Sequence, residues 1–383
     1  MSVAQDDSLI IRTWYEIAAH ALDARASDIH IEAGAQATLI RFRVDGLLRV
    51  HSHYPIELHE RLIARIKVLA RLDLAEKRLP QDGRLCIGHN FSKPDRDCRV
   101  SILPTLHGEK GVIRILPSCT DDLDLEEIGF LPDQLREVQH ALAQPNGLII
   151  VTGPTGSGKT RTLYSCLRHL NQSHRNLCSI EDPIEIRLAG VNQVAYHPRA
   201  GLDFPTIIRA LLRQDPDVIM IGEIRDAATA NLAIQAAQTG HLILSTLHTR
   251  NAHGAVPRLQ HLGIDQESLE SCLLVVSSQR LIRMTCQQCL NRNPNEKAQC
   301  LNCGDSGYFG RIGVHEVLSQ SKLFDQTLQA LRLFQRVEVF ALHVFNQGHG
   351  RGGLVGHIAH QHRYLAQTRQ LGGSKTPLTG DDF

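Results

Sequence analysis

The eight residues from Gly153 to Thr160, GPTGSGKT, constrain the fold more than any other part of this 383-residue chain. They form a complete G-x-x-x-x-G-K-[ST] loop, in which glycines let successive backbone N–H groups turn towards a polyphosphate. The apolar run over 148–151 predicts a buried parallel strand before the loop, and helical spacing of apolar residues follows from 161 to about 170. A helix that begins at such a loop favours an anion through its dipole. This order predicts a nucleotide site, whereas a simple glycine-rich turn does not require lysine beside threonine.

The loop residues have separate predicted roles. Lys159 is expected to reach the β- and γ-phosphates, and the hydroxyl of Thr160 is expected to ligate Mg²⁺. The remaining residues are expected to cradle the phosphates with their backbone: Gly153, Pro154, Thr155, Gly156, Ser157 and Gly158. The sequence therefore predicts a P-loop nucleotidase.

The bulk properties are those of an ordinary globular protein. The chain is 42% hydrophobic and 21% charged, and its formal net charge of +1 gives no global argument for a nucleic acid or an anionic membrane as partner. No apolar stretch approaches the roughly 20 residues that a spanning helix needs. The N-terminus lacks the basic start and apolar core of a secretory signal. We therefore expect a cytosolic protein, in which the ten cysteines do not form a disulfide framework.

Residues 1–118 are expected to form a small mixed α/β domain. Asp45-Gly46 is a hairpin signal between two alternating segments. The predicted helices lie near 8–24 and 58–70, and the predicted strands near 38–44, 47–51, 84–87, 96–102 and 111–116.

Three further segments follow this domain. Residues 119–127 contain an acidic run and are expected to be a linker. Strand–helix alternation over 128–320 predicts a doubly wound, mainly parallel sheet. Residues 321–383 have weak periodicity and are expected to form a divergent, disordered or frameshifted tail. The spacing of five tail histidines is too irregular for a metal site: His343, His349, His357, His360 and His362.

Two acidic residues follow predicted buried strands. The strand over 218–221 ends at Gly222-Glu223, and a carboxylate at this end of a strand beside the P-loop polarises water or holds Mg²⁺ through water. Gly222 stands where an acid is usual, so Glu223 is expected to act mainly on water. The strand over 177–180 ends at Glu181, which is expected to compensate in metal binding; the alternative is a helix or loop cap.

A third strand–loop unit contains two histidines. The segment over 240–249, GHLILSTLHT, places His241 and His248 around an apolar strand. Hydroxyl and imidazole groups suit a sensor of the γ-phosphate. The alternative is that both histidines are structural.

Four cysteines have the spacing C-x₂-C-x₁₀-C-x₂-C. Two such knuckles place four thiolates around Zn²⁺ in a closed structural site, because no position remains for water. The predicted ligands are Cys286, Cys289, Cys300 and Cys303. The other cysteines are expected to be buried small apolar residues: Cys86, Cys98, Cys119, Cys166, Cys178 and Cys272.

Together these motifs resemble the secretion ATPase superfamily, which powers type II secretion, type IV pilus assembly and DNA-uptake pseudopili. The resemblance covers about residues 8–318. It rests on the P-loop, the four cysteines and the stretches 26–32 (ASDIHIE), 41–46 (RFRVDG), 79–84 (LPQDGR), 181–185 (EDPIE), 212–226 (LRQDPDVIMIGEIRD) and 236–249 (AAQTGHLILSTLHT).

The resemblance implies a hexameric ring in which a PAS-like N-terminal domain packs on a RecA-like ATPase domain, with ATP between them. It also implies that four arginines approach the phosphates, since a guanidinium stays charged and stabilises phosphoryl transfer. By motif these are Arg84, Arg99, Arg209 and Arg213. For each of them the alternative is a surface ion pair that contributes little. Larger members carry an extra N-terminal domain that docks on a membrane partner, and the early start of the match here is more like the competence ATPases.

The leading hypothesis is a cytosolic motor at the cytoplasmic face of a membrane. It hydrolyses ATP and passes domain motion to a polytopic membrane platform protein, which acts on pilin-like subunits. The alternative is a RecA-like nucleic-acid motor, but the cysteine segment is not basic, so no direct nucleic-acid binding is expected. A non-hydrolysing structural ring is the third possibility.

Overall fold

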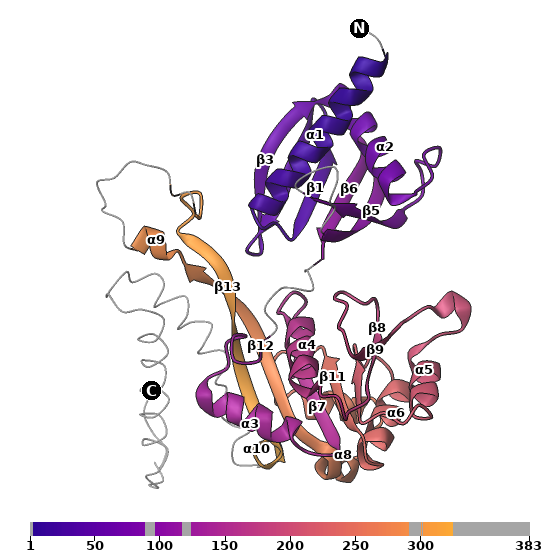
Figure 1. The fold of residues 1–383 in the computed structure, drawn as a ribbon, viewed down its shortest axis with the longest axis vertical. Helices are drawn as coiled ribbons and strands as arrows, with labels where there is room; N and C mark the ends of the chain where they lie inside the picture. Colours follow the sequence, from indigo (N-terminus) through magenta and orange to yellow (C-terminus); the bar gives the residue numbers. More distant parts are fainter. Residues whose placement is uncertain (1–2, 89–95, 117–123, 291–299, 301, 325–383) are drawn as a thin grey trace, which may run out of the picture.

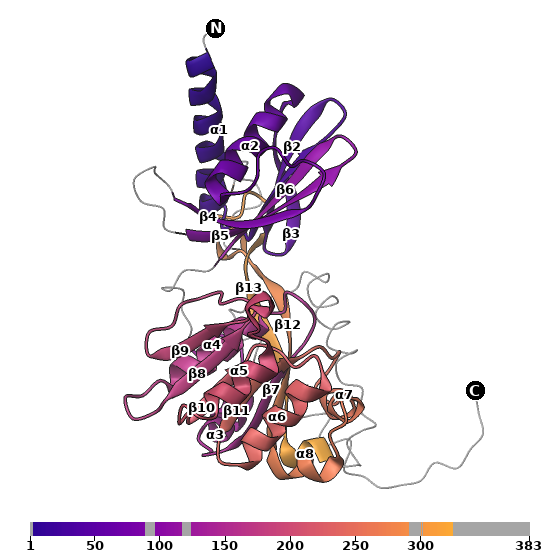
Figure 2. The same cartoon turned by 90° about the vertical axis from the view of Figure 1, so that its right-hand side faces the viewer.

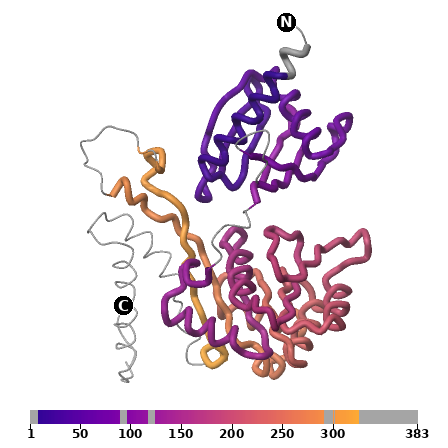
Figure 3. The backbone as a smooth tube through the Cα atoms, viewed as in Figure 1, coloured from indigo at the N-terminus to yellow at the C-terminus, as the bar shows by residue number. Residues whose placement is uncertain are grey.

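The structure is a computed structural model that describes residues 3–88, 96–116, 124–290, 300 and 302–324. Two β-sheets, one from strands within residues 28–115 and one from strands within 147–319, each have their own hydrophobic core. The two regions are separate in space (Figure 1, Figure 3).

The N-terminal region is a six-stranded antiparallel sheet with the order β3-β2-β1-β6-β5-β4. Alternation along the strands sends apolar residues such as Ile29 and Ile31 to one face, where Trp14 and Ile17 of the first helix and Leu62 of the second cover them. The opposite face carries charged side chains. The elements are α1 Val3–Asp23, β1 Asp28–Ala33, β2 Ala37–Val44, β3 Leu47–Pro55, a 3₁₀ turn Ile56–Leu58, α2 His59–Ala70, β4 Gln81–Ile87, β5 Arg96–Thr105 and β6 Gly108–Ile115.

The second region contains a seven-stranded sheet with the order β13-β12-β7-β11-β10-β8-β9. Its strands are parallel except for β13, which pairs antiparallel with β12 at one edge. The elements are α3 Pro132–Leu142, β7 Gly147–Thr152, α4 Lys159–Leu170, β8 Leu177–Glu181, β9 Val191–Ala195, a 3₁₀ turn Pro198–Ala200, α5 Phe204–Leu211, β10 Val218–Ile221, α6 Ala227–Gln238, β11 Leu242–Leu247, α7 Ala255–His261, α8 Gln266–Cys272, β12 Leu273–Thr285, α9 Gln287–Leu290, β13 Tyr308–Ser319 and α10 Gln320–Phe324.

Helices cover both faces of this sheet. α3 and α4 supply Leu142, Leu163 and Leu167 to one core, whereas α5, α6 and α8 supply residues such as Ile208 and Ile234 to the other. The predicted mainly parallel sheet with helices on both faces is therefore confirmed. Figure 2 shows that the long β12–β13 ribbon extends beyond the sheet towards the N-terminal region.

The element boundaries differ from expectation at several places. α1 begins at Val3 rather than near residue 8, and β9 and the length of the β12–β13 ribbon were not predicted. α10 continues past residue 320, and Leu323 packs in the same core as α5 and α6, so the second sheet's region extends to Phe324. The remainder of the predicted tail, with its five histidines, lies outside the described residues. Within the described ranges, the helices are all too short or too polar to cross a bilayer.

Candidate functional site

The P-loop connects the carboxyl end of β7 to α4, and its glycines adopt left-handed backbone angles. The φ angles of Gly153, Gly156 and Gly158 are 140°, 77° and 89°. A Cβ atom on Gly153 would lie 2.4 Å from the carbonyl oxygen of Gln279. The loop therefore requires glycine both for its turn and for its close approach to β12.

Gln279 braces the loop from β12, and the sequence analysis did not identify it. Its side chain is 2% exposed; its amide donates to the carbonyl oxygen of Ser157 at 2.6 Å and its oxygen accepts from the Thr162 hydroxyl at 2.7 Å. The only sequence signal is an uncharged polar residue within the mostly apolar run 273–282. The buried Oγ of Ser157 has no hydrogen-bond partner among the described residues, and an unsatisfied donor in this cradle fits an anionic ligand.

Lys159 begins α4 and folds back over its own loop. Its Nζ donates to the carbonyl oxygens of Gly153 at 2.9 Å and Pro154 at 3.1 Å. Burial lowers the pKa of Lys159, and the nearby charge of Glu223 opposes that shift. The ammonium group thus lies within electrostatic range of the predicted catalytic acid.

Glu223 directly follows β10 and lies beside His248, which follows β11. The Oε2 atom of Glu223 is 3.7 Å from Nε2 of His248, and the same carboxylate pairs with Arg225. Burial and the charge of Lys159 lower the pKa of His248, so this imidazole is mainly neutral at pH 7. The structure therefore brings together Lys159, Glu223 and His248 at one edge of the parallel sheet.

Gly222, the residue that replaces the usual acid, packs against the end of β8. Its N–H donates to the carbonyl oxygen of Ile180 at 2.8 Å, and a Cβ atom at this position would lie 3.0 Å from that oxygen. The backbone approach leaves little room for a side chain. This close packing is a physical reason for glycine where an aspartate was expected.

The carboxylate of Glu181 is enclosed by neighbouring side chains rather than open to solvent. Its carboxylate is 3% exposed and accepts hydrogen bonds from the Tyr164 hydroxyl, from Ser179 Oγ at 2.5 Å and from Gln193 Nε2 at 2.9 Å. Burial and the neighbouring carboxylate raise the pKa of Tyr164, which keeps that donor protonated. The expected metal-binding role of Glu181 is corrected, because its oxygens are already committed to the packing of β8, β9 and α4.

Three other residues that were predicted for the site, His241, Arg209 and Arg213, lie away from the P-loop of the same chain. His241 precedes β11, whose amino end pairs with the amino end of β7, so this histidine lies at the opposite edge of the sheet. Arg209 lies in the last turn of α5, and Arg213 follows it towards the amino end of β10; both are exposed, and Arg213 Nη1 donates to the Arg209 carbonyl oxygen at 2.7 Å. The described structure therefore places neither arginine beside the P-loop of the same chain, and their approach to phosphates stays a prediction.

The four predicted metal-ligating cysteines meet at the far end of the β12–β13 ribbon. The Sγ atoms of Cys286 and Cys300 are 3.9 Å apart, those of Cys289 and Cys303 are 3.3 Å apart, and all four lie within 4.8 Å of one another. Zn–S bonds of about 2.3 Å in a tetrahedron separate sulfur atoms by about 3.8 Å. The donor set and its spacing fit a zinc ion.

Among the remaining cysteines, one expectation was wrong. Cys98, Cys166, Cys178 and Cys272 are buried as predicted, but Cys86 is exposed, because it lies on the charged face of the N-terminal sheet and donates to Asp97 Oδ1 at 3.0 Å. Cys119 lies outside the described residues.

With the P-loop geometry established, comparison with known proteins decides the family. The sequence profile of the family described as Type II/IV secretion system protein matches residues 3–339. The chain belongs to this family.

This Type II/IV secretion system protein has similar relatives among curated proteins. It is 45% identical over 332 residues to the type II secretion system protein E of Klebsiella pneumoniae, which covers 82% of this chain and 66% of that protein. It is 42% identical over 340 residues to the type IV pilus assembly ATPase PilB of Myxococcus xanthus, with 83% and 60% covered. The chain spans about two thirds of the length of these curated relatives.

Solved structures show the same fold for this family member. The pilus retraction motor PilT with bound ADP matches with a TM-score of 0.57 at 25% identity, covering 84% of this chain and 88% of that one. The ATPase DotB of Legionella pneumophila matches with a TM-score of 0.61 at 23% identity, covering 93% and 94%. The α/β fold is therefore the one that these two solved proteins have.

In this secretion-family chain, Arg84 and Arg99 lie on the charged face of the N-terminal sheet. They are paired in register on β4 and β5. Burial and the charge of Arg84 lower the pKa of Arg99, while Glu185 and Asp182, from the segment after β8, raise it. Arg99 therefore lies near the carboxylates that follow β8, whose neighbour β10 leads into Glu223. Among the described residues, no hydrogen bond or ion pair joins either arginine to the P-loop.

A second contact joins the N-terminal sheet to the cysteine cluster. Phe309 of β13 packs against the cluster, and the guanidinium of Arg25 lies 3.6 Å from the centre of its ring. Asp45, in the β2–β3 turn, lies 3.8 Å from Arg25 and accepts from the Gly310 N–H at 3.1 Å. The hairpin turn that the sequence predicted is thus a docking point for the ribbon.

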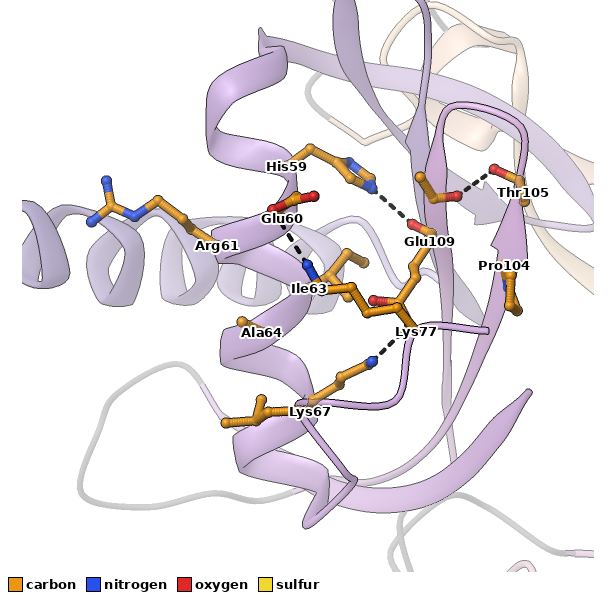
Figure 4. A pocket seen from close by; sticks show the side chains of 12 residues that line it. His59, Glu60, Arg61, Ile63, Ala64, Lys67, Lys77, Pro104, Thr105 and Glu109 are labelled. Atoms are coloured by element: carbon orange, nitrogen blue, oxygen red, sulfur yellow. Dashed lines mark hydrogen bonds and ion pairs between the residues drawn. The ribbon is translucent and has the colours of Figure 1, made fainter. Parts of the chain in front are cut away.

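The pocket in Figure 4, about 390 Å³ in volume, is separate from the sheet edge that carries Lys159 and Glu223. It lies between α2 and the β5–β6 hairpin, on the face of the N-terminal sheet that α2 covers. Its Lys67 is almost fully buried, pairs with Glu109 Oε1 at 2.6 Å and donates to the Glu76 carbonyl oxygen at 2.8 Å. These partners satisfy the buried charge, so the cluster stabilises the hairpin against α2.

Proposed function

We propose that this chain is a motor ATPase that hydrolyses ATP to drive assembly of a pilus- or pseudopilus-like fibre, in type II secretion, type IV pilus assembly or DNA uptake. The observation that carries the proposal is the meeting of Lys159, Glu223 and His248 at one sheet edge, in a chain of the secretion family. The relatives named as a type II secretion protein and as a pilus assembly ATPase support the cellular role.

The residues present fit ATP with Mg²⁺. The P-loop N–H groups, the unpaired Ser157 hydroxyl and Lys159 would hold the phosphates, and Thr160 would ligate the cation. Bound Mg²⁺ would supply neutralisation of phosphate charge. Glu223 would orient the attacking water, with His248 beside it as a neutral hydrogen-bonding group. Among the described residues near this edge, Glu223 is the carboxylate best placed for that task.

We propose a PAS-like domain at 1–118, a linker at 119–127 and a RecA-like ATPase domain from 128 to about 320 with its α10 extension. The cysteine cluster would bind a structural zinc ion, because all four ligand positions are thiols. Closure of the first domain on the second would bring Arg84 and Arg99 to the phosphates. Arg209 and Arg213, exposed and remote from this chain's own P-loop, would reach only a site in another subunit.

The proposed assembly is a homo-hexamer at the cytoplasmic face of a membrane. Its proposed partner is a polytopic membrane platform protein, through which it acts indirectly on pilin-like subunits. No direct contact with nucleic acid is proposed. Stimulation of hydrolysis by single-stranded DNA, with binding that weakens steeply as salt rises, would instead favour a nucleic-acid motor.

The deciding experiment compares Glu223→Gln with Glu267→Gln, a matched change at an exposed residue of α8. We expect Glu223→Gln to bind ATP with Mg²⁺ normally but to release phosphate at least about 100-fold more slowly, since it cannot polarise water. Glu267→Gln should match the wild type in both assays. Wild-type turnover by Glu223→Gln would refute the assignment, and the absence of Mg²⁺-dependent nucleotide binding by the wild type would refute the proposed function.

A further inference from the structure

A row of charged side chains crosses the exposed face of the N-terminal sheet. The strand register places Arg84 opposite Arg99, Arg99 opposite Arg114, Arg114 opposite Asp28 and Asp28 opposite Arg43. Neighbouring strands are about 4.8 Å apart, and residues in register point to the same face. Arg84, Arg99 and Arg114 therefore stand side by side within about 10 Å.

Asp28 fixes Arg114 at the end of this row. The carboxylate is 5% exposed; its Oδ1 accepts from Nε of Arg114 at 2.9 Å and its Oδ2 from the Ser27 hydroxyl at 2.8 Å. A buried carboxylate held by two donors is a rigid anchor. Arg114 is therefore oriented through Nε, although its side chain remains 64% exposed.

The terminal amino groups distinguish Arg114 from the other arginine that contacts Asp28. Nη1 of Arg43 donates to the carbonyl oxygen of Gly46 at 3.0 Å, so its guanidinium is committed to the β2–β3 turn. Over the described parts of the chain, no hydrogen bond engages the terminal amino groups of Arg114. Its bidentate edge is thus available to an anion.

Three adjacent guanidinium groups repel one another and require negative charge opposite them. For Arg99 that charge comes from Asp182 and Glu185, in the segment that follows β8. The charge of Arg114 also acts on Glu185, where together with Arg99 it opposes the raised pKa that burial gives this carboxyl group. The charges of Arg99 and Arg114 therefore both act on the segment after β8, the strand that pairs with β10, and β10 leads into Glu223.

We propose that Arg114, oriented by Asp28, is a third phosphate-binding guanidinium beside Arg84 and Arg99, for the terminal phosphate of a nucleoside triphosphate in the P-loop. This inference rests on the proposed ATPase function. Phosphate oxygens replace the carboxylates of Asp182 and Glu185 as the anionic partners when the N-terminal sheet approaches the loop. Asp28 is a positioning residue, because it acts only by holding Arg114.

The test uses the full chain with four substitutions: Arg114→Gln, Arg114→Lys, Asp28→Asn and, as control, Arg12→Gln, at an exposed arginine of α1 outside the row. Arg114→Gln should lower kcat/KM for ATP about tenfold or more, the loss expected for one charged hydrogen bond, while the affinity for ADP stays unchanged. Arg114→Lys should recover only part of this loss, because it keeps the charge but not the planar fork. Arg12→Gln should leave hydrolysis near the wild-type rate.

Asp28→Asn should give a smaller loss than Arg114→Gln, and it should add nothing further in the Arg114→Gln background, since both changes remove the same contact. Equal kinetics for Arg114→Gln and Arg12→Gln would overturn the proposal, as would an equal loss of ADP and ATP affinity. If Arg114→Gln lowers thermal stability, Arg114→Lys and the Asp28→Asn cycle still decide the question. A wild-type chain that neither binds nor hydrolyses ATP would instead refute the proposed function.

Discussion

Two of the contacts that join the described parts of the N-terminal region and the second region differ in chemistry. At the β2–β3 turn, Arg25 stacks on Phe309 and Asp45 accepts from the Gly310 N–H. At β5, Arg187 lies 3.9 Å from Asp97, with side chains that are 84% and 59% exposed. The first is a short-range contact backed by the cysteine cluster, whereas the second is a loose, solvated ion pair.

The difference suggests separate mechanical roles. A packed aromatic contact with a backbone hydrogen bond has one preferred geometry and resists sliding. An exposed ion pair is screened by salt and is easily exchanged for another partner. As a hypothesis, the N-terminal sheet rotates about the contact between the β2–β3 turn and the ribbon beside the cysteine cluster, which we call the pivot. The β5 face is then the part that approaches and leaves the nucleotide site.

The largest expected effect comes from removing the metal ligands at the pivot. In Cys289→Ser/Cys303→Ser we expect loss of about one bound zinc per chain and unfolding of the knuckle, because structural zinc binding of about 10–16 kcal/mol in small peptides is folding free energy. Metal analysis and hydrogen exchange would measure this. Exchange should also rise in the turn at 44–47, which docks on the ribbon.

The matched control is Cys86→Ser, at an exposed cysteine outside the cluster. It should change neither zinc content nor exchange at the turn. If the double variant loses zinc but hydrogen exchange at the turn stays unchanged, the pivot does not depend on the folded cysteine cluster. That result would contradict the proposed link between them.

The next largest effect concerns the base of the ribbon and depends on pH. His315 of β13 is 6% exposed; Nε2 lies 3.2 Å from the Ile128 carbonyl oxygen, and burial lowers the pKa of this imidazole to about 4. The unfolded chain, with an ordinary histidine pKa near 6.5, binds the proton more readily. Neutral His315 therefore stabilises the fold fully above about pH 6.5, and that stability is lost as pH falls towards 4, by up to about 3 kcal/mol.

Urea unfolding of the wild type and of His315→Gln from pH 7 to pH 4 would isolate this contribution. The difference between the two proteins in free energy of unfolding should shrink across this window. A constant difference would show that His315 does not titrate as its burial implies. Such a result would remove the pH dependence assigned to the ribbon's base but would leave the β5 face unaffected.

The sequence predicted those site residues whose positions are set by the short strand directly before them. The P-loop, Glu223 and His248 each stand directly after an apolar strand, and parallel strands bring their carboxyl ends to one edge. The same rule could have excluded His241, which precedes its strand. The error arose because two histidines in one motif were treated as one site.

Residues that depend on register between distant strands could not be predicted in this way. Gln279 reaches the P-loop from β12, and Asp28 meets Arg114 across a pairing of residues 86 positions apart. Strand register is set by the alternation of apolar and polar residues along all the strands of a sheet, and no single motif contains that information. Glu181 was misassigned for a related reason, because the residues that satisfy its carboxylate include Tyr164 from the helix after the P-loop.

A smaller effect is expected from loosening the pivot itself. Arg25→Ala removes the stacked guanidinium from Phe309, and a cation–π contact of this kind contributes about 0.5–2 kcal/mol. A double-mutant cycle with Phe309→Leu should give a coupling energy in this range, measured by unfolding. Arg12→Ala, at an exposed arginine of α1 whose i,i+4 partner is Glu16, is the control and should show no coupling to Phe309. A coupling near zero for Arg25 would mean that Asp45 and the Gly310 N–H hold the turn without the aromatic ring.

The smallest effect should come from the β5 ion pair. Asp97→Asn removes one charge from an exposed pair, so the free energy of unfolding should change by at most about 1 kcal/mol, and less at high salt. The same cycle with Arg187→Gln at 50 mM and 500 mM salt would measure it. A coupling above that value, unaffected by salt, would mean that the two contacts are equally firm. In that case the N-terminal sheet would be clamped at both ends, and approach of the arginine row to the nucleotide would require breaking both contacts rather than rotating about one.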